Sequence, residues 1–352
     1  MHTIAFPKLA DYDIPVLYLL RHVTKLKVIK PRVNLEIIEL GSKNSPDFVC
    51  APFKYTLGTL IDGLEHGADT LIQFGGGCRY GYYASLQEEI LKKLGYKFKM
   101  YNLITAGKTD IKRIKKIFKS IDPNINITRS FRYLLIALTM VKYMDKIDDY
   151  IRENIGFEVV KNSFINLKRK MLNDFYNCKG LFHLKILYRK YKKLFKKIEI
   201  DKPKNYLRVG VIGELYTLME SSANYDIEYE LAKYGIAIKR FTNVTYLLLK
   251  KRRLVKKYLR KMKNIKYRLG ADALDNVYHT KYLCKKKYDG IVHIKSSFCT
   301  PEIAVMPLIN DIAHKNNVPV IFFSFDTNTS KVGVETRIEA FVDMLNMKKE
   351  RL

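Results

Sequence analysis

The chain has 352 residues, 47% of them hydrophobic, and its formal net charge is +29 at pH 7. This length leaves room for two domains of ordinary size, and the apolar content excludes wholesale disorder. No apolar run approaches the roughly 18 residues that span a bilayer, and the first residues lack the basic and apolar segments of a secretory signal. We therefore expect a soluble, cytoplasmic protein without a membrane partner, whose five cysteines are kept reduced and form no disulfide framework.

Short apolar runs alternate with amphipathic segments over the first hundred residues, a pattern typical of a parallel sheet covered by helices. The predicted strands are residues 3–6, 35–40, 70–74 and 98–103, and the predicted helices are residues 16–26, 55–66 and 84–94. From about residue 111 to 198 the strand signals vanish. Long basic amphipathic segments, such as 131–151 and 181–195, predict a helical module there.

The strand and helix alternation resumes after residue 204. The predicted strands are residues 207–212, 236–239, 290–294 and 318–323, and the predicted helices are residues 225–234, 244–263, 301–314 and 337–347. The sequence therefore predicts an α/β fold with two parallel-sheet domains and a helical insert. We expect an N-terminal α/β domain over residues 1–110, a helical module over 111–204 and a C-terminal α/β domain over 205–352.

The large positive charge allows two interpretations. Lys and Arg side chains neutralise phosphates, so a charge of this size generally favours nucleic-acid binding. The absence of Trp beside abundant Lys and Tyr indicates instead a broad compositional bias, in which lysines lie on solvated helix faces. The densest basic segments are residues 112–119, 187–197 and 250–266. We expect solvated helix faces there, disfavour nucleic acid as a partner, and leave open an acidic protein partner or a phosphorylated ligand.

Three of the five cysteines lie in short loops between an apolar run and a helix-like segment. Cys78 and Cys299 each follow a predicted strand, and Cys50 stands just before Pro52 and a helix. Ligands of open α/β sheets bind at the carboxyl ends of strands, and helix N-termini stabilise thiolates. Three thiolates from distant segments suggest an iron–sulfur cluster. Three ligands would leave one iron of a 4Fe-4S cubane open to bind a substrate.

Other interpretations of the cysteines are weaker. Structural zinc sites pair their ligands as Cys-x2-Cys or similar, and no two cysteines here lie within four residues of each other. Any one cysteine alone is better explained as a buried small hydrophobe, but three comparable loops together favour ligands. Cys178 and Cys284 lack such a setting, and we expect neither to be a ligand.

The glycines beside Cys78 do not form a dinucleotide-binding motif. Gly75, Gly77 and Gly81 give G-x-G-x3-G, without an acidic residue ending the following strand, and the chain has no P-loop. Glycines have no side chain, so these residues are better explained as leaving room for a bulky inorganic group beside Cys78.

A polar loop near the C-terminus leads into a helix. Thr336, with Glu339 three residues later, is typical of a capping box at a helix start. Arg337 between them could alternatively face the cluster loop or a ligand phosphate.

The order of these motifs resembles the 2-hydroxyacyl-CoA dehydratase and benzoyl-CoA reductase family, especially its stand-alone branch of CoA-substrate-specific activase-related and double-cubane cluster proteins. The resemblance covers most of the two α/β regions. It rests on Cys50-Ala51-Pro52-Phe53-Lys54, Gly76-Gly77-Cys78-Arg79-Tyr80-Gly81-Tyr82-Tyr83, Val209-Gly210-Val211-Ile212-Gly213-Glu214, Cys299-Thr300-Pro301-Glu302, Asp326 and Thr336-Arg337-Ile338-Glu339-Ala340-Phe341.

The resemblance implies flavodoxin-like (Rossmann-like) domains and a 4Fe-4S or double-cubane cluster with Cys50, Cys78 and Cys299 as ligands. It also implies that a separate ATP-dependent iron–sulfur activase supplies low-potential electrons, and it is compatible with a homodimer or a related subunit. The chain would then be the electron-accepting component of a reductase or a 2-hydroxyacyl-CoA dehydratase-like lyase. The substrate stays open between an acyl-CoA and another small molecule, and no residue of the basic insert is assigned to an acyl-CoA pocket.

Two alternatives to a cluster-bearing catalyst remain at this point. One is a non-catalytic iron–sulfur component of a larger complex. The other is a basic module that binds nucleic acid or an acidic partner, with idle cysteines.

Overall fold

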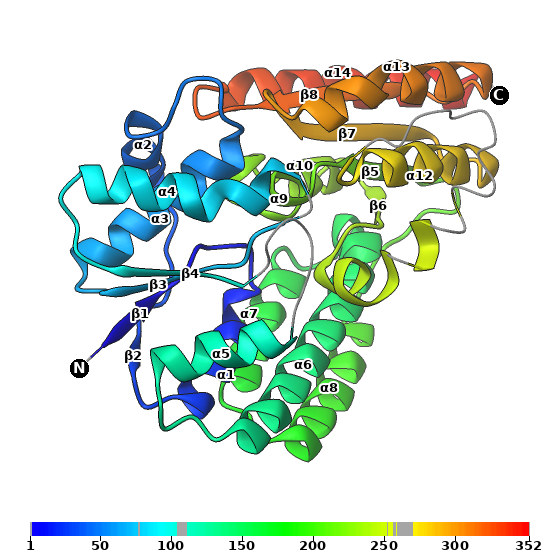
Figure 1. Ribbon diagram of the computed structural model, residues 1–352. Helices are drawn as coiled ribbons and strands as arrows, with labels where there is room; N and C mark the ends of the chain where they lie inside the picture. Colours follow the sequence, from blue (N-terminus) through cyan, green and yellow to red (C-terminus); the bar gives the residue numbers. More distant parts are fainter. Residues whose placement is uncertain are drawn as a thin grey trace. The chain divides into compact units, whose positions relative to one another are not determined.

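The computed structural model describes residues 2–76, 78–103, 111–251, 253–255, 258 and 270–351. The chain divides into two compact units, which we call the N-terminal and C-terminal units (Figure 1). The N-terminal unit comprises Met1–Met140 and Phe175–Leu184, and the C-terminal unit comprises Val141–Asp174 and Lys185–Leu352. Each unit contains one four-stranded, all-parallel sheet, which confirms the predicted α/β fold with two parallel-sheet domains.

The sheet of the N-terminal unit has the strand order β2-β1-β3-β4. Its strands are β1 (Thr3–Ala5), β2 (Lys27–Val28), β3 (Thr70–Gln73) and β4 (Lys99–Asn102). Its helices are α1 (Asp13–Val23), α2 (Leu35–Lys43), α3 (Ala51–Glu65), the 3-10 turn η1 (Arg79–Tyr82), α4 (Tyr83–Lys93) and α5 (Ile111–Ile121). Successive residues of a strand point to opposite faces of the sheet. Leu71 and Ile72 accordingly pack in two different hydrophobic clusters, and helices cover both faces of the sheet.

The predicted strand at residues 35–40 is wrong, because this segment is helix α2. The Asn34 side chain caps the helix by accepting a hydrogen bond from the Ile37 amide at 2.9 Å. A Cβ on Gly41 would lie 2.0 Å from the Lys54 carbonyl oxygen, and one on Gly58 would lie 2.0 Å from the Ile37 carbonyl oxygen. The two glycines therefore let α2 and α3 pack backbone against backbone, a tertiary contact that the short apolar run does not reveal.

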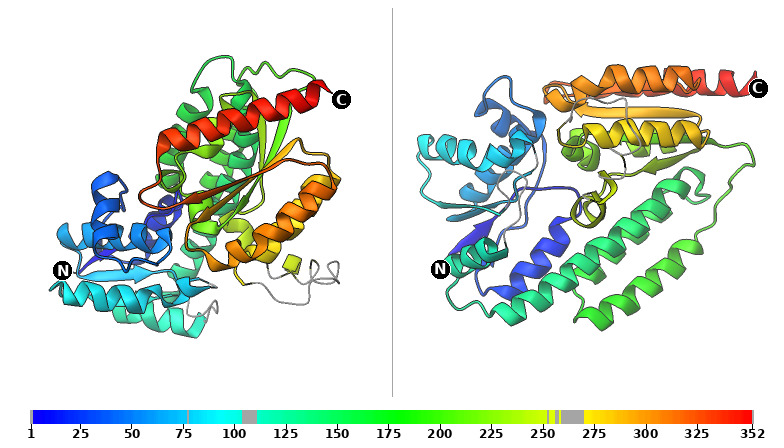
Figure 2. Two further views of the ribbon diagram at one scale, coloured as in Figure 1. Left: turned by 90° about the horizontal axis from the view of Figure 1, so that it is seen from above. Right: turned by 45° about the vertical axis from the view of Figure 1, so that its right-hand side comes forward.

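The sheet of the C-terminal unit has the corresponding order β6-β5-β7-β8. Its strands are β5 (Leu207–Gly213), β6 (Ile236–Arg240), β7 (Gly290–Ser296) and β8 (Val320–Phe325). The segments around it are α9 (Leu215–Met219), η3 (Ser221–Ala223), α10 (Ile227–Ala232), η4 (Tyr246–Lys250), α12 (Ala273–Lys285), α13 (Thr300–Lys315) and α14 (Lys331–Glu350). Figure 2 shows α13 and α14 on opposite faces of this sheet, in agreement with its two hydrophobic clusters.

The helix predicted at 244–263 lies partly outside the described residues and is helical wherever it is described. Residues 244–245, 251, 253–255 and 258 are α-helical, and Tyr246–Lys250 (η4) is π-helical. Helix α12 was not predicted, because four polar residues occupy part of its buried side and hide the apolar periodicity. These buried residues are Asp275, Asn276, His279 and Thr280.

Four further helical segments join the sheets: α6 (Ile127–Asn154), η2 (Ile155–Phe157), α7 (Ser163–Tyr176) and α8 (Leu181–Lys196). They confirm the helices predicted at 131–151 and 181–195. The border between the units falls within α6, α7 and α8, and the domain boundaries predicted at residues 110 and 204 stay a prediction. Within the described residues, no helix has the length and apolar content needed to cross a membrane.

Candidate functional site

The carboxyl ends of both sheets carry the predicted cysteine loops. The first and third strands of each unit lie side by side in the middle of its sheet: β1 beside β3, and β5 beside β7. The second strand lies at one edge of the sheet and the fourth strand at the other edge. Such a reversal of strand order creates a crevice at the carboxyl ends of the two middle strands. Cys78 follows β3 and Cys299 follows β7, which are the third strands of their sheets. The predicted placement of both cysteines between a strand and a helix is confirmed.

All three predicted ligands lie at the N-terminal ends of helical segments. Cys50 is the N-cap residue of α3, Cys78 of η1 and Cys299 of α13. Pro52 and Pro301 occupy the first turns of α3 and α13, where a missing backbone N–H costs nothing. Amide groups and the helix dipole at such positions favour a thiolate over a thiol.

In the N-terminal unit an aromatic pair links the two cysteines. The Cys50 sulfur is in hydrogen-bond contact with the Tyr83 hydroxyl group, and the Cys78 sulfur accepts a hydrogen bond from the Tyr80 amide at 3.4 Å. The Tyr80 and Tyr83 rings lie 4.5 Å apart between centroids, and the Phe53 ring meets Tyr83 edge-on at 4.9 Å. Cys50 and Cys78 therefore lie beside the same group of aromatic rings. Cys78 is exposed to solvent, and Cys50 is partly buried.

A buried network of neutral side chains lies at the end of β3 in this unit. The Gln73 amide on β3 donates to the Gln87 carbonyl oxygen on α4 at 2.7 Å. Gln87 in turn donates to the Thr56 hydroxyl group on α3 at 2.8 Å. The network thus joins the third strand to the helices before and after it without any ionisable group.

In the C-terminal unit, ionisable groups form the corresponding network near Cys299. The His293 Nε2 atom on β7 lies 2.8 Å from a carboxylate oxygen of Glu302, three residues after Cys299 on α13. Glu302, 1% exposed, also accepts from the Asn276 amide on α12 at 2.9 and 3.0 Å. Asn276 pairs with both the amide and the carbonyl group of Gly213 at the end of β5. The network therefore ties the first turn of α13 to β5, β7 and α12.

Lys295 places a buried positive charge beside Cys299. The residue is 4% exposed at the end of β7, and burial lowers the pKa of its ammonium group. The negative charges of Cys299 and Glu302 counteract this shift, since both favour the protonated amine. An ammonium group in this position would stabilise an ionised sulfur at Cys299.

Glu214 adds a group at the end of β5 that can titrate near neutral pH. Its carboxylate caps α9, accepting from the Tyr216 and Thr217 amides at 2.8 and 2.9 Å. The pKa of Glu214 is raised to about 7, mainly by burial and to a smaller extent by the negative charge of Asp272. The hydrogen bonds from Tyr216 and Thr217 favour the ionised form and partly offset this rise. The Glu214 amide donates to the Ile294 carbonyl oxygen at 2.8 Å, so this carboxyl group lies beside β7.

A second group of buried ionisable side chains surrounds the start of α12. The Tyr246 hydroxyl group donates to Asp275 at 2.8 Å, and Lys251 forms ion pairs with Asp272 and Asp275. Burial raises the pKa of Asp275 to about 6, although Lys251 and Tyr246 favour its ionised form. Burial also lowers the pKa of His279 to about 3. These groups neighbour Asn276 along the same helix.

Sequence reasoning missed the network around Cys299, although β7 carries a signal for it. The strand reads Gly-Ile-Val-His-Ile-Lys-Ser, and all seven residues are buried. A histidine and a lysine within an otherwise apolar central strand are costly to bury, so their presence indicates specific partners. His293 and Lys295 could have been selected on that basis, whereas Asn276 and Glu302 could not.

The remaining predicted positions have structural roles. The capping box is wrong, because Ser330 caps α14 by accepting from the Gly333 amide, and Thr336 lies inside the helix, donating to the Val332 carbonyl group. Arg337 donates to the Phe322 carbonyl oxygen at 2.7 Å, tying α14 to β8. Cys178 and Cys284 are 2% and 7% exposed, respectively. Burial raises the pKa of Cys284, which makes it a poor ligand.

The residues present suit an iron–sulfur cluster chemically, although the described residues contain no group of three His, Cys, Asp or Glu side chains that could hold a metal ion. Thiolates are the ligands such clusters take, and those of this chain have helix amides, a tyrosine hydroxyl and a lysine nearby. Gly75, beside Cys78, adopts a φ of +68°, and Gly77 lies outside the described residues.

The fold and these loops define a class: flavodoxin-like α/β proteins with cysteines at the carboxyl ends of their sheets. Within it, residues 185–345 match the family model of the D-component of 2-hydroxyglutaryl-CoA dehydratase. The matched residues contain the sheet of the C-terminal unit and Cys299, and the match supports the 2-hydroxyacyl-CoA dehydratase family. No curated protein matches the chain.

Proposed function

We propose that the protein is a cluster-bearing, dehydratase-like component that receives electrons from an ATP-dependent activator. In this proposal Cys50, Cys78 and Cys299 bind a 4Fe-4S or double-cubane cluster. The observation that carries it is the position of Cys299, at the start of α13 and beside the β5/β7 crevice, within the residues that match the dehydratase family. The stand-alone branch of that family is part of the proposal, as is a cytoplasmic location.

The protein's own residues supply three things to such a cluster. Helix N-termini and the Lys295 ammonium group balance the negative charge of the thiolates. The Tyr83 hydroxyl group and the Tyr80 amide donate hydrogen bonds at sulfur, which tune a cluster's potential. When bound, the cluster would supply single electrons at low potential and an open iron for a substrate oxygen.

A group that accepts and donates a proton is also required, since dehydration removes a proton from a substrate carbon and delivers one to the departing hydroxyl group, which leaves as water. Glu214, with its pKa near 7, is a described group at the β5/β7 edge that can exchange a proton at neutral pH. We assign it that role for an acyl-CoA or another small hydroxylated substrate.

Anaerobic purification followed by iron and acid-labile sulfide determination tests the proposal. We expect about four irons per chain, or a double cubane per dimer, and loss of iron in Cys50→Ser, Cys78→Ser and Cys299→Ser. Cys178→Ser is the matched control, because this cysteine is buried and belongs to none of the three loops, so its loss should leave iron unchanged. A colourless protein after anaerobic reconstitution would contradict the cluster.

Turnover then separates a catalyst from a non-catalytic component. With chemically reduced activator, ATP and a hydroxyacyl-CoA, a catalyst should form the unsaturated product, and Glu214→Gln should slow this step while retaining iron. A cluster that is reduced by the activator without product formation would support the non-catalytic alternative.

A further inference from the structure

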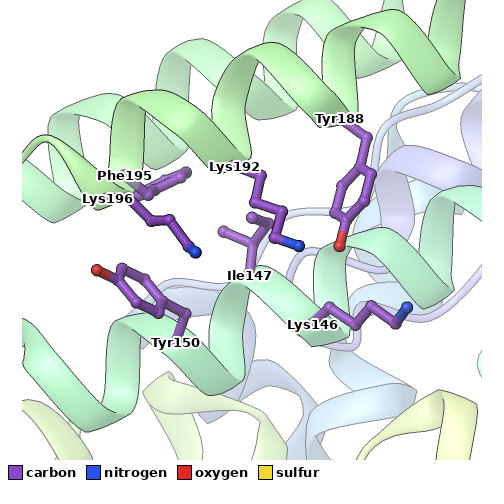
Figure 3. Close-up of a pocket in the computed structure, with 7 residues that line it drawn as sticks. All are labelled: Lys146, Ile147, Tyr150, Tyr188, Lys192, Phe195 and Lys196. Carbon is purple, nitrogen blue, oxygen red and sulfur yellow. The ribbon is translucent and has the colours of Figure 1, made fainter.

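A cavity of about 250 Å³ lies between α6 and α8 in the C-terminal unit (Figure 3). Its apolar part is formed by Ile147 from α6 and Phe195 from α8, which are both buried. The Phe195 ring stacks on Phe164 of α7 with 6.1 Å between centroids, so this floor is fixed by the helical packing.

Three ammonium groups surround the cavity. Lys192 and Lys196 stand one turn apart on α8 and point toward α6, which contributes Lys146 (Figure 3). Two lysines next to them in the helical region are paired with carboxylates: Lys190 on α8 with Asp174 at 3.5 Å, and Lys168 on α7 with Asp148 on α6 at 2.9 Å. No acidic side chain of the described residues pairs with any of the three cavity lysines. Their charge is therefore available to an anion.

Two tyrosines give the cavity flat walls. Tyr188 on α8 stacks on Tyr143 with centroids 3.9 Å apart and planes at 7°, so its ring is held in place. Tyr150 lines the cavity from α6 (Figure 3). Burial raises the pKa of both phenols, so they stay neutral at physiological pH and can donate hydrogen bonds to an anion.

The size of the cavity limits what it can enclose. Pockets that bury most of a drug-sized ligand measure roughly 300–1,000 Å³, and this one is smaller. It can therefore enclose only one part of a ligand, such as a ring system, while a charged part stays at the rim. The three lysines are exposed and stand at that rim.

We propose that this cavity binds a free nucleotide: a flat base packed against Tyr150 and Tyr188, with its phosphates between Lys146, Lys192 and Lys196. Multiple negative charges match three unpaired ammonium groups, and an aromatic base matches the tyrosine walls better than a bare anion does. The site does not depend on the proposed cluster, since none of its residues belongs to the cysteine loops.

Equilibrium dialysis of the full-length protein with labelled ADP tests this assignment, with adenosine and pyrophosphate as ring-only and phosphate-only probes. We expect ADP to bind at least about tenfold more tightly than either probe, a difference of about 1.4 kcal/mol. Lys192→Gln/Lys196→Gln should weaken ADP binding at least about tenfold. Lys190→Gln/Lys193→Gln removes the same charge from α8 outside the cavity, and should change binding less than about twofold.

A tyrosine variant distinguishes the loss of a specific contact from misfolding. Tyr150→Ala should weaken ADP binding but leave pyrophosphate binding unchanged, whereas a misfolded variant loses both. Equal affinities for ADP and pyrophosphate would show that the cavity recognises phosphate groups alone, and would overturn the proposal. So would an equal loss in both double variants, or binding of oligonucleotides or acidic peptides in preference to ADP, because these indicate a diffuse basic surface. Failure of ADP to bind also overturns it.

Discussion

The two sheets place a cysteine at the same topological position but surround it with different chemistry. In the N-terminal unit, Gln73, Gln87 and Thr56 join the third strand to the helices before and after it. In the C-terminal unit, His293, Glu302 and Asn276 occupy the same three types of element. Topology thus determines where the cysteine lies, and the helices around it determine whether its surroundings are neutral or ionisable.

Because of this difference, we assign different functions to the two units. Cys50 and Cys78 lie among aromatic rings and neutral amides, which suit a sulfur ligand and little else. Cys299 lies near Lys295, which can balance its charge, and Glu214 at the end of the neighbouring strand β5 can exchange protons. We therefore expect proton-coupled chemistry to depend on the C-terminal unit.

Gly213→Ala should produce the largest effect and test whether β5 sets the C-terminal crevice. Gly213 has a φ of +149°, and a Cβ there would lie 1.8 Å from the Ile294 carbonyl oxygen. The carbonyl belongs to β7, so relief requires the two strands to separate. We expect a loss of at least about 4 kcal/mol in the free energy of unfolding, measured by urea denaturation.

Gly235→Ala is the matched control, since φ is +67° there and the nearest atom to a new Cβ is 3.9 Å away. It should cost only about 1–2 kcal/mol, the strain of the left-handed conformation. Equal losses in the two variants would show that backbone strain, and not the β5–β7 contact, makes Gly213 necessary.

Glu302→Ala should cost about 3 kcal/mol, because it leaves His293 and Asn276 buried without their shared acceptor. Gln87→Ala, the corresponding change in the N-terminal unit, should cost about 1–2 kcal/mol since only neutral partners lose bonds. Urea denaturation measures both, and Glu302→Gln should recover part of the loss. A larger loss from Gln87→Ala would remove the energetic distinction between the two networks.

Asp275→Asn should change how stability depends on pH. The folded pKa of about 6 lies above the ordinary value near 3.9, so the Asp275 contribution is fully present below pH 4 and is lost as pH rises to 6. The asparagine variant lacks this loss. Between pH 4 and 7 its unfolding free energy should therefore rise relative to the natural protein by roughly 2–3 kcal/mol.

Thermal or urea denaturation across that pH range measures the difference. His279 acts in the opposite direction, since its lowered pKa removes stability as pH falls from 6.5 toward 3. Both proteins contain His279, so its effect cancels. A difference that is constant with pH would show that Asp275 keeps its ordinary pKa when folded.

Tyr83→Phe should have the smallest effect on stability, about 1 kcal/mol, because the ring contacts with Tyr80 and Phe53 remain while the hydroxyl contact with Cys50 is lost. Tyr82→Phe is the control on a 65% exposed residue and should be neutral. Differential scanning calorimetry measures both. A loss above about 3 kcal/mol would mean that the N-terminal site also depends on a polar network.

The sequence predicted the strands of both sheets well, except for the two-residue β2, because the apolar runs are short and end in loops. It also placed all three cysteines at the ends of strands or the starts of helices. It failed at Leu35–Lys43, where a glycine contact with α3 decides the conformation, and at α12, whose inner side is polar. The His293–Glu302–Asn276 network could not be predicted, since its members come from three separate elements.

The glycine contact between α2 and α3 also bears on the mobility of Cys50. Helix α3 is buried from Ala51 to Leu64, and at Gly41 and Gly58 its main chain touches that of α2. A helix enclosed in this way has little freedom to rotate or slide, so the sulfur at its start keeps a fixed direction. In the proposed cluster, such stiffness would keep the reorganisation energy of electron transfer small, which favours fast transfer over regulation by movement.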